Sequence, residues 1–338
     1  MLEPPDVPSE RIVACLRAAY GLRAVEVTFL PIGADAGSAA YRVVTADGGR
    51  YFAKLRRAFR EIAVTLPRYL SDQGIAEIIP PVATTGGRLF APLDPFVLIV
   101  YPFVDGRDGF EVALSPSQWM AFGAAIKRLH TMAFPPTLIA DIPRETYAPR
   151  YRDSLRRALE LIGRGVWADP AAAELAAFLR GRREETADLV ERAGRYAAAL
   201  LAAPRPFVVC HSDAHAGNLL IDTEGRLFIV DWDEPILAAK ERDLMFVGGA
   251  QGFAGYTASE QERLFYGGYG PTEVDPVALT YYHYERIVVD LALFCEQLLL
   301  TDEGGADRWQ ALRFVRANYD SEGTIATARW VERASHLA

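Results

Sequence analysis

The first hundred residues alternate between apolar and polar positions in short runs, a pattern typical of β-strands. These runs cover 25–30, 40–45, 51–55, 82–84, 88–90 and 96–100. The second and third flank Asp47-Gly48-Gly49, which is typical of a hairpin turn. After the third run, Ile62, Leu66 and Leu70 recur every four residues and predict one helix that ends near Gly74.

Beyond residue 115 the apolar positions follow a helical period instead. The segments with this pattern are 117–130, 151–162, 171–201, 259–266, 277–300, 308–319 and 324–336. Only the segment Phe207–Asp231 interrupts them, with short apolar runs that predict a β-hairpin. We therefore predict an α+β fold with two lobes. An N-terminal antiparallel sheet lobe with one main helix would span 1–100, a hinge 101–106, and a larger helical C-terminal lobe 107–338.

Charge is distributed unevenly along the 338 residues, whose net charge is −8. The first 104 residues carry 11 Lys or Arg and 10 Asp or Glu, and the remainder carries 25 and 34. An acidic chain is a poor candidate for binding nucleic acid, because affinity there depends on neutralising phosphates. The acidic C-terminal part suits a cationic small-molecule substrate, although a simple contribution to solubility is the more ordinary explanation of the charge alone.

Cysteine usage and the lack of long apolar segments bear on the compartment. The three cysteines, Cys15, Cys210 and Cys295, are odd in number and widely spaced, which favours free thiols in a reducing compartment. Residues 1–10 are acidic and contain proline, unlike a signal peptide. The longest apolar run, Pro95–Val104, is too short to cross a bilayer. We expect a cytoplasmic protein that needs neither a membrane nor a protein partner.

The segment His211-Ser-Asp-Ala-His-Ala-Gly-Asn218 carries the strongest chemical signal in the chain. Asp213 precedes Asn218 by five residues, and Asp231 ends the apolar run that follows. Two carboxylates and an amide in this order are what a kinase needs to orient a hydroxyl and to hold magnesium against ATP. A zinc site made of His211, Asp213 and His215 is the alternative, but it leaves Asn218 and Asp231 unexplained.

This motif, followed by Phe228-Ile-Val-Asp231-Trp232, resembles the core of the aminoglycoside phosphotransferase family, small-molecule kinases with a protein-kinase-like fold. The resemblance implies that ATP and Mg²⁺ are used. It implies that Asp213 orients the acceptor hydroxyl and accepts its proton, and that Asn218 and Asp231 ligate magnesium. His211 is expected to brace the loop through hydrogen bonds. Ser212 stands where the family usually has glycine.

The resemblance also suggests how the nucleotide is bound. Lys54 would contact the phosphates and be held by Glu61 of the following helix. The small-residue loop Gly33–Ser38, with Ser38, would cover the phosphates, although it matches no glycine-rich phosphate motif. Tyr101 and Phe103 would form the hinge beside the adenine, and a plain interdomain turn explains them equally well.

Within this family, the chain is similar to the spectinomycin phosphotransferases, for example in Cys210-His-Ser-Asp213 and Trp232-Asp-Glu-Pro235. The implied acceptor is a cationic aminocyclitol or aminoglycoside antibiotic. Carboxylates that could contact its amines are Asp233, Glu234, Glu285 and Asp290, unless they pair with neighbouring Lys and Arg side chains. Two alternatives remain: a metabolite kinase acting on choline, homoserine or methylthioribose, or a nucleotide-binding regulator without turnover.

Overall fold

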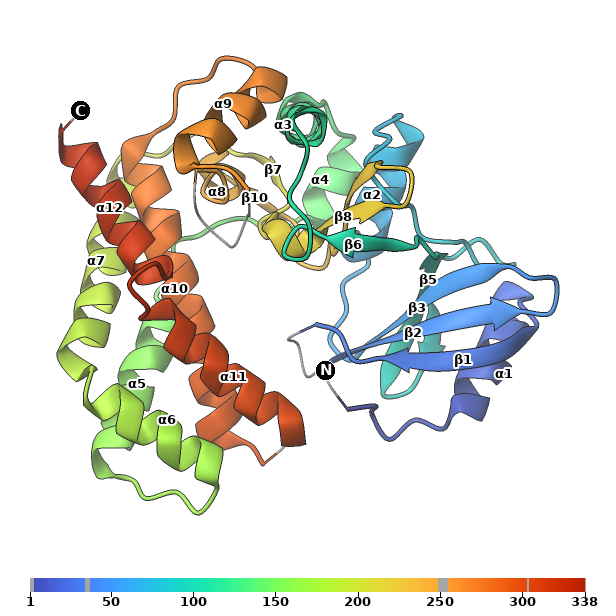
Figure 1. The fold of residues 1–338 in the computed structure, drawn as a ribbon, viewed down its shortest axis with the longest axis horizontal. Coiled ribbons are helices and arrows are strands. Elements are labelled where there is room, and N and C mark those ends of the chain that lie inside the picture. The colour runs from blue at the N-terminus through green and yellow to red at the C-terminus, as the bar shows by residue number, and fades with distance from the viewer. Residues whose placement is uncertain (1–2, 34–36, 249–254, 303, 338) are drawn as a thin grey trace. The chain divides into compact units, whose positions relative to one another are not determined.

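The computed structural model describes residues 3–33, 37–248, 255–302 and 304–337. The chain forms two compact units (Figure 1). Unit 1 comprises Met1–Pro143, Val208–Leu237 and Gly252–Pro271, and unit 2 comprises Arg144–Phe207, Ala238–Gln251 and Thr272–Ala338. These units do not coincide with the lobes expected from the sequence, because the helix after residue 115 and the hairpin after residue 207 cluster with the first hundred residues.

A five-stranded antiparallel sheet forms the N-terminal part of unit 1, as the alternating pattern predicts. Its strands are β1 (Ala24–Leu30), β2 (Ser38–Thr45), β3 (Arg50–Arg56), β4 (Ala91–Leu93) and β5 (Phe96–Pro102). They lie in the order β1-β2-β3-β5-β4. Lys54 of β3 lies opposite Ala40 of β2 and Ile99 of β5, so the lysine occupies the centre of the sheet. The predicted hairpin joins β2 to β3, with Gly48 at a φ of 84°.

Helix α1 (Ser9–Tyr20) precedes the sheet and was not expected from the sequence. Its residues Ile12, Leu16 and Tyr20 are buried in the same core as Tyr41 and Leu55 of the sheet. These three residues are four apart, so the sequence does contain the helical period in this segment. The sheet thus has one face covered by a helix.

The predicted strands at 82–84 and 88–90 are wrong, because neither segment is extended in a ladder. The Thr84 N–H donates to Arg88 O, which closes a turn around Gly86 and Gly87. The Val82 N–H donates to Val100 O, a single bond that does not continue along β5. A ladder needs several such bonds in succession. Here the chain turns at the two glycines after a single bond to β5.

The remaining helices of unit 1 are α2 (Ile62–Asp72), α3 (Pro116–Thr131), α4 (Pro136–Asp141) and α9 (Ala258–Tyr269). Helix α3 begins one residue earlier than predicted, because Ser115 caps it through a capping box with Gln118. Helices α3 and α9 cross closely: a Cβ at Gly268 would lie 1.8 Å from Met120 O, and one at Gly123 would lie 2.1 Å from Phe265 O. Glycine at these two positions therefore permits the backbones to approach.

Short strands after residue 105 build the frame of the motif segment. They are β6 (Gly106–Asp108), β7 (Val208–Cys210), β8 (Leu219–Asp222), β9 (Leu227–Ile229) and β10 (Ile236–Ala238), and the 3₁₀ turn η1 covers Ala216–Asn218. Strands β6, β8 and β9 form a sheet in that order, and β7 pairs with β10. The hairpin predicted between 207 and 231 is therefore present, as the pair β8 and β9.

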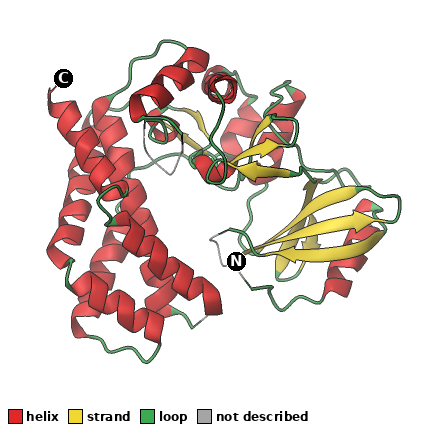
Figure 2. Cartoon of the chain, in the orientation of Figure 1, coloured by secondary structure: helices red, strands yellow, loops and turns green. Residues whose placement is uncertain are grey.

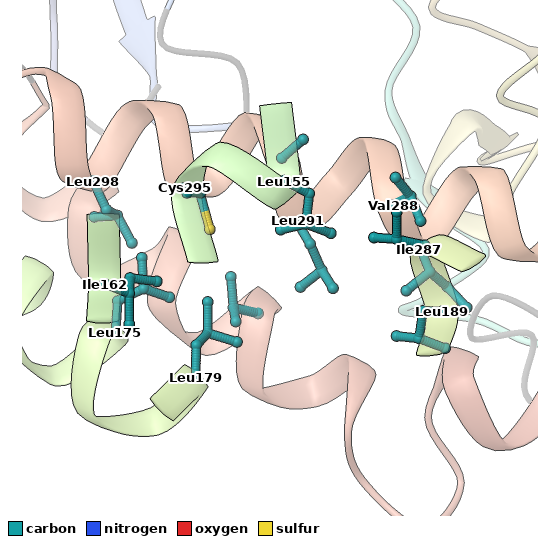
Figure 3. Packing of buried hydrophobic residues seen from close by; sticks show 14 of the residues in the cluster. Leu155, Ile162, Leu175, Leu179, Leu189, Ile287, Val288, Leu291, Cys295 and Leu298 are labelled. Atoms are coloured by element: carbon teal, nitrogen blue, oxygen red, sulfur yellow. The ribbon is translucent and has the colours of Figure 1, made fainter. Parts of the chain in front are cut away.

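Unit 2 is helical where it is described, apart from the end of β10 (Figure 2). Its helices are α5 (Arg150–Arg164), α6 (Pro170–Arg180), α7 (Arg183–Ala202), α8 (Glu241–Leu244), α10 (Pro276–Leu300), α11 (Gly305–Asn318) and α12 (Thr324–Leu337). Helix α10 runs through the bundle, and its Ile287, Leu291, Cys295 and Leu298 share one core with α5, α6 and α7 (Figure 3). The segregated strands and helices confirm the predicted α+β class.

Where the chain is described, none of its helices has the length and apolar character that a bilayer crossing requires.

Candidate active site

The motif segment runs from the end of β7 through η1 into β8, entirely within unit 1. In the β8–β9 ladder Leu219 lies opposite Ile229, and the Val230 N–H donates to Asn218 O at 2.9 Å. This bond places the start of β8 beside the end of β9. Asn218 and Asp231, thirteen residues apart in sequence, are therefore brought to the same end of the hairpin.

His211 holds this end of the hairpin together. Its Nδ1 accepts the Asp213 N–H at 3.2 Å, so Nε2 carries the proton and donates to Val230 O at 3.0 Å. The ring also packs edge-on against Trp232, with centroids 4.5 Å apart. Because backbone groups use both ring nitrogens, the arrangement supports a bracing role for His211 and disfavours the zinc alternative.

Ser212 adopts a left-handed backbone conformation, with φ at 73°. Its hydroxyl donates to Glu234 O at 2.6 Å, which ties the motif segment to the residues after β9. Only glycine adopts this conformation at little cost. Ser212 therefore carries backbone strain, and its hydrogen bond to Glu234 O offsets part of that strain.

Asp213 and Asn218 are joined by two hydrogen bonds. The Asn218 amide donates to Asp213 O at 2.8 Å and to Asp213 Oδ2 at 3.3 Å. His215 lies beside them, with Nε2 at 3.7 Å from Asp213 Oδ2, and its Nδ1 accepts the Gly217 N–H at 3.0 Å. The amide nitrogen of Asn218 faces Asp213, so the amide oxygen is the atom that offers a ligand to a cation. Half-buried Asp213 keeps access to solvent.

Lys54 of β3 reaches the loop after β9. Its Nζ lies 2.8 Å from Asp231 Oδ1 and 2.7 Å from Asp233 Oδ2, and Arg56 Nη1 also contacts Asp233 Oδ2. Asp231 has a positive φ of 63°, which aspartate tolerates better than most residues. The predicted nucleotide lysine and the predicted metal aspartate are therefore in direct contact.

The charges in this cluster shift one another's pKa values. Burial alone would lower the pKa of Lys54, but Asp231 and Asp233 raise it above its usual value. Desolvation would raise the pKa of Asp231, yet the Lys54 ammonium holds it below its usual range. Burial raises the pKa of Asp233 despite its two cationic neighbours, because Asp231 adds to the rise. Lys54 therefore remains an ammonium that can bind phosphate oxygens.

Glu61 does not hold Lys54 in this structure. It lies exposed immediately before α2, and among the described residues no ion pair joins it to Lys54. The sequence spacing places the glutamate near the start of the helix, but the lysine amine turns toward the loop after β9. The pairing expected from the kinase-like fold is thus not the one formed here.

The other expected nucleotide contacts are only partly described. Ser38 begins β2 opposite Arg56, and Gly33 has a φ of 85°, whereas residues 34–36 of the expected phosphate loop lie outside the described residues. Tyr101 and Phe103 lie at the end of β5, where the Phe103 N–H donates to Arg50 O at 3.1 Å. This N–H therefore extends the pairing of β5 with β3. That the backbone of this segment binds the adenine stays a prediction.

Three of the four expected substrate carboxylates are already paired. Asp233 contacts Lys54 and Arg56. In unit 2, Glu285 pairs with Arg152 at 2.7 Å and Asp290 pairs with Arg286 at 3.1 Å. Glu234 is exposed and has no ion pair among the described residues. Glu234 is accordingly the carboxylate of this set that is most accessible to a cationic ligand.

Sequence reasoning missed Arg56, although a signal for it was present. Residues two apart on a strand point to the same face, so Arg56 must accompany Lys54 on β3. The same period-two spacing separates Asp231 from Asp233 after β9. Lys54 and Arg56 are two residues apart, and so are Asp231 and Asp233. If one cation contacts one of these carboxylates, the other two side chains are expected to lie in the same cluster.

Residues 28–235 match the model of the phosphotransferase enzyme family, APH. This match covers more than half of the chain, which therefore belongs to that family. The predicted family, the kinase-like fold and the enzyme class of a phosphotransferase acting on hydroxyl groups are confirmed. A regulator without turnover is not the class that this family defines.

The chain is similar to known members of the family. It is 32% identical to spectinomycin phosphotransferase APH(9)-Ia, solved in complex with ADP and spectinomycin, with a TM-score of 0.88 over 97% of this chain and 100% of that one. The AMP-bound complex of spectinomycin phosphotransferase APH(9)-Ia is 31% identical to this chain, with a TM-score of 0.81 over 94% of this chain and 97% of that one. Protein StrN of Streptomyces griseus is 27% identical over 179 residues, 52% of this chain and 55% of StrN. The chain thus matches only about half the length of that curated relative.

Proposed function

We propose that this phosphotransferase moves the γ-phosphoryl group of ATP, with Mg²⁺, to a hydroxyl of a cationic aminocyclitol antibiotic related to spectinomycin. The observation that carries the proposal is the contact between Lys54 Nζ and Asp231 Oδ1 at 2.8 Å. It joins the lysine of the sheet to the loop that follows β9, at the end of the hairpin where Asn218 and Asp213 lie. A kinase requires that convergence.

The residues present fit a magnesium ion. Asp231 offers a carboxylate that is 43% exposed, and Asn218 offers the amide oxygen that faces away from Asp213. Hard oxygen ligands of this kind suit magnesium, which usually keeps several waters and binds substrate phosphates as well. When bound there, magnesium neutralises charge on the transferring phosphates. Lys54 then exchanges its contact with Asp231 for a phosphate oxygen.

Asp213 supplies the acid–base chemistry of the transfer. Its backbone and side chain are both held by Asn218, which fixes the carboxylate in one orientation. The carboxylate accepts the proton of the acceptor hydroxyl as the hydroxyl oxygen forms its bond to the γ-phosphorus. The bond from the γ-phosphorus to the bridging oxygen breaks, and ADP leaves with that electron pair. Positioning, more than basicity, is what Asp213 contributes.

Two features support a cationic acceptor. The spectinomycin phosphotransferase with bound ADP and spectinomycin is similar over nearly the whole chain. The residues after position 104 carry nine more acidic than basic side chains, and exposed Glu234 follows the charge cluster directly. Negative charge near a site raises the local concentration of a cationic ligand. Spectinomycin carries amines, so its class is the first to test.

A coupled assay of ADP release tests the acceptor. Purified protein would be given ATP, Mg²⁺ and either spectinomycin, other aminoglycosides, choline, homoserine or methylthioribose. The proposal expects turnover with spectinomycin or a close aminocyclitol and an increase in spectinomycin tolerance on expression in a sensitive bacterium. Turnover with one of the three metabolites alone would instead assign the chain to metabolism.

We propose a cytoplasmic location, where ATP is available. All three cysteines are free thiols in the structure, and Cys210 and Cys295 are buried. Free buried thiols are usual in reducing compartments. Fractionation of cells that express the untagged protein tests this point, and recovery in an extracytoplasmic fraction would overturn it.

A further inference from the structure

The kinase-like fold does not by itself show which carboxylate positions Lys54 in this chain. The sequence suggests Glu61, but that side chain is exposed before α2. Two other carboxylates contact the amine: Asp231 and Asp233. These two differ in their surroundings, and the difference decides which of them can keep the lysine in place.

Asp233 is the enclosed member of the pair. Its side chain is 13% exposed, as are Lys54 at 14% and Arg56 at 12%, whereas Asp231 is 43% exposed. One oxygen, Asp233 Oδ2, accepts from Lys54 Nζ and from Arg56 Nη1. Attraction between charges strengthens as water is excluded from around them. Asp233 thus lies between two cations of one strand with little access to water.

The two cations that hold Asp233 come from one strand. Lys54 and Arg56 are two apart on β3, which pairs with β2 on one side and β5 on the other. Their backbones therefore cannot shift independently. Arg56 anchors the carboxylate, and the carboxylate in turn fixes the direction of the Lys54 side chain. A flexible lysine gains most from such a fixed partner, because its side chain otherwise loses much rotamer freedom on binding.

Asp231 is poorly suited to positioning Lys54 once magnesium and the nucleotide are bound. A metal-bound carboxylate has its charge shared with the cation, so its hold on the lysine weakens. Asp233 is not among the residues proposed to bind magnesium, and it already pairs with Arg56. We infer that Asp233, anchored by Arg56, is the positioning residue for Lys54 during nucleotide binding, in the role that the fold would otherwise give to Glu61. This inference rests on the proposed nucleotide-dependent function.

The test compares Asp233→Asn with the competing variant Glu61→Gln and with Asp72→Asn as a matched surface control. Asp72 pairs with Arg68 on the exposed face of α2, with side chains 49% and 43% exposed. Calorimetric titration with ADP, in EDTA and then with magnesium, measures binding apart from turnover. Initial rates give KM for ATP, KM for the acceptor and kcat. Urea unfolding reports stability in each variant.

Asp233→Asn should weaken ADP binding about 10-fold to 100-fold both in EDTA and with magnesium, as expected for a lost charge-assisted contact. KM for ATP should rise by a similar factor, with little change in KM for the acceptor. Arg56→Gln should weaken ADP binding in the same way, and Arg56→Lys should restore part of it. Glu61→Gln should resemble the Asp72→Asn control.

Other patterns overturn the inference. A loss of binding in Glu61→Gln with none in Asp233→Asn would return the role to the helix glutamate. A loss seen only with magnesium would make Asp233 a metal ligand, and a change in acceptor KM alone would make it a substrate contact. If Asp233→Asn does not fold, unchanged ADP affinity in Arg56→Gln overturns the inference. Absence of ADP binding by the unaltered protein would instead remove the proposed function itself.

Discussion

Arg152 Nη1 lies 2.7 Å from Glu285 Oε2 in unit 2, with side chains only 5% and 9% exposed. The arginine also donates to Tyr147 O at 2.7 Å, so one side chain joins α5, α10 and the segment before α5. Glu285 was a candidate for binding the amines of the acceptor. A buried carboxylate that is already neutralised by an arginine serves the packing of the bundle first.

Replacing Arg152 with Met tests this structural role. The variant leaves Glu285 buried without its cation, so the free energy of unfolding should fall by about 3–5 kcal/mol. Urea denaturation at neutral pH measures the change. The double variant Arg152→Met with Glu285→Leu should recover most of the loss. A stable single variant with impaired acceptor binding would contradict the structural role and return Glu285 to the substrate.

Ser212 provides a test of backbone strain in the motif segment. Ser212→Ala keeps the left-handed φ of 73° and loses the bond to Glu234 O, so stability should fall by about 1 kcal/mol. Ser212→Gly loses the same bond but relieves strain of about 1–2 kcal/mol. Glycine should therefore be better tolerated than alanine by about 1–2 kcal/mol in thermal or urea unfolding. Equal losses in both variants would show that the conformation is not strained.

His211 should affect the rate through positioning alone. Its two ring nitrogens bond to the Asp213 N–H and to Val230 O, so the ring has no nitrogen left for acid–base work. His211→Gln should lower kcat and stability together, because the brace is weakened. The shape of the pH–rate profile should stay that of the unaltered enzyme. Loss of one limb of that profile would identify His211 as the catalytic base.

The chemical motif was easier to predict from the sequence than the contacts around it. Asp213, Asn218 and Asp231 could be singled out because short loops and one hairpin fix their relative positions. The pairing of Lys54 with Asp233 spans 179 residues, and nothing local indicates it. Glu61 seemed the better partner since it is near in sequence, but the Lys54 side chain forms its ion pairs with Asp231 and Asp233, which are distant in sequence.

The fold was predictable to a similar extent. Most long helices and four of the five strands of the sheet, β1, β2, β3 and β5, followed from periodicity, because burial on one face imposes it. The strands expected at 82–84 and 88–90 failed for lack of a partner ladder, which a single segment does not reveal. The sequence does not indicate the division into compact units that the structure shows. This division depends on which distant segments pack together, as α3 and α9 do through Gly123 and Gly268.

His283 of α10 makes stability depend on pH. The side chain is 6% exposed, and burial lowers its pKa to about 4. In the unfolded chain the pKa is about 6.5. The unfolded state therefore binds the proton first, and stability present above pH 6.5 is lost as the pH falls toward 4. The loss should be on the order of 3 kcal/mol for this group.

Urea unfolding of the unaltered protein and of His283→Gln at pH 7.5 and pH 4.5 isolates this effect. The difference in unfolding free energy between the two proteins should favour the unaltered protein less at pH 4.5 than at pH 7.5, because glutamine does not titrate. Subtraction removes the contribution of the carboxylates common to both. A difference that is the same at both pH values would show that His283 titrates normally in the fold.

Asp213, held by Asn218, is proposed to act on the acceptor hydroxyl and to contribute little to nucleotide binding. The most direct measurement is the single-turnover rate of Asp213→Asn alongside its ADP affinity with magnesium. The account predicts a rate about 10²–10⁴ lower with an almost unchanged dissociation constant for ADP. A variant that transfers the phosphoryl group at the unaltered rate would contradict it.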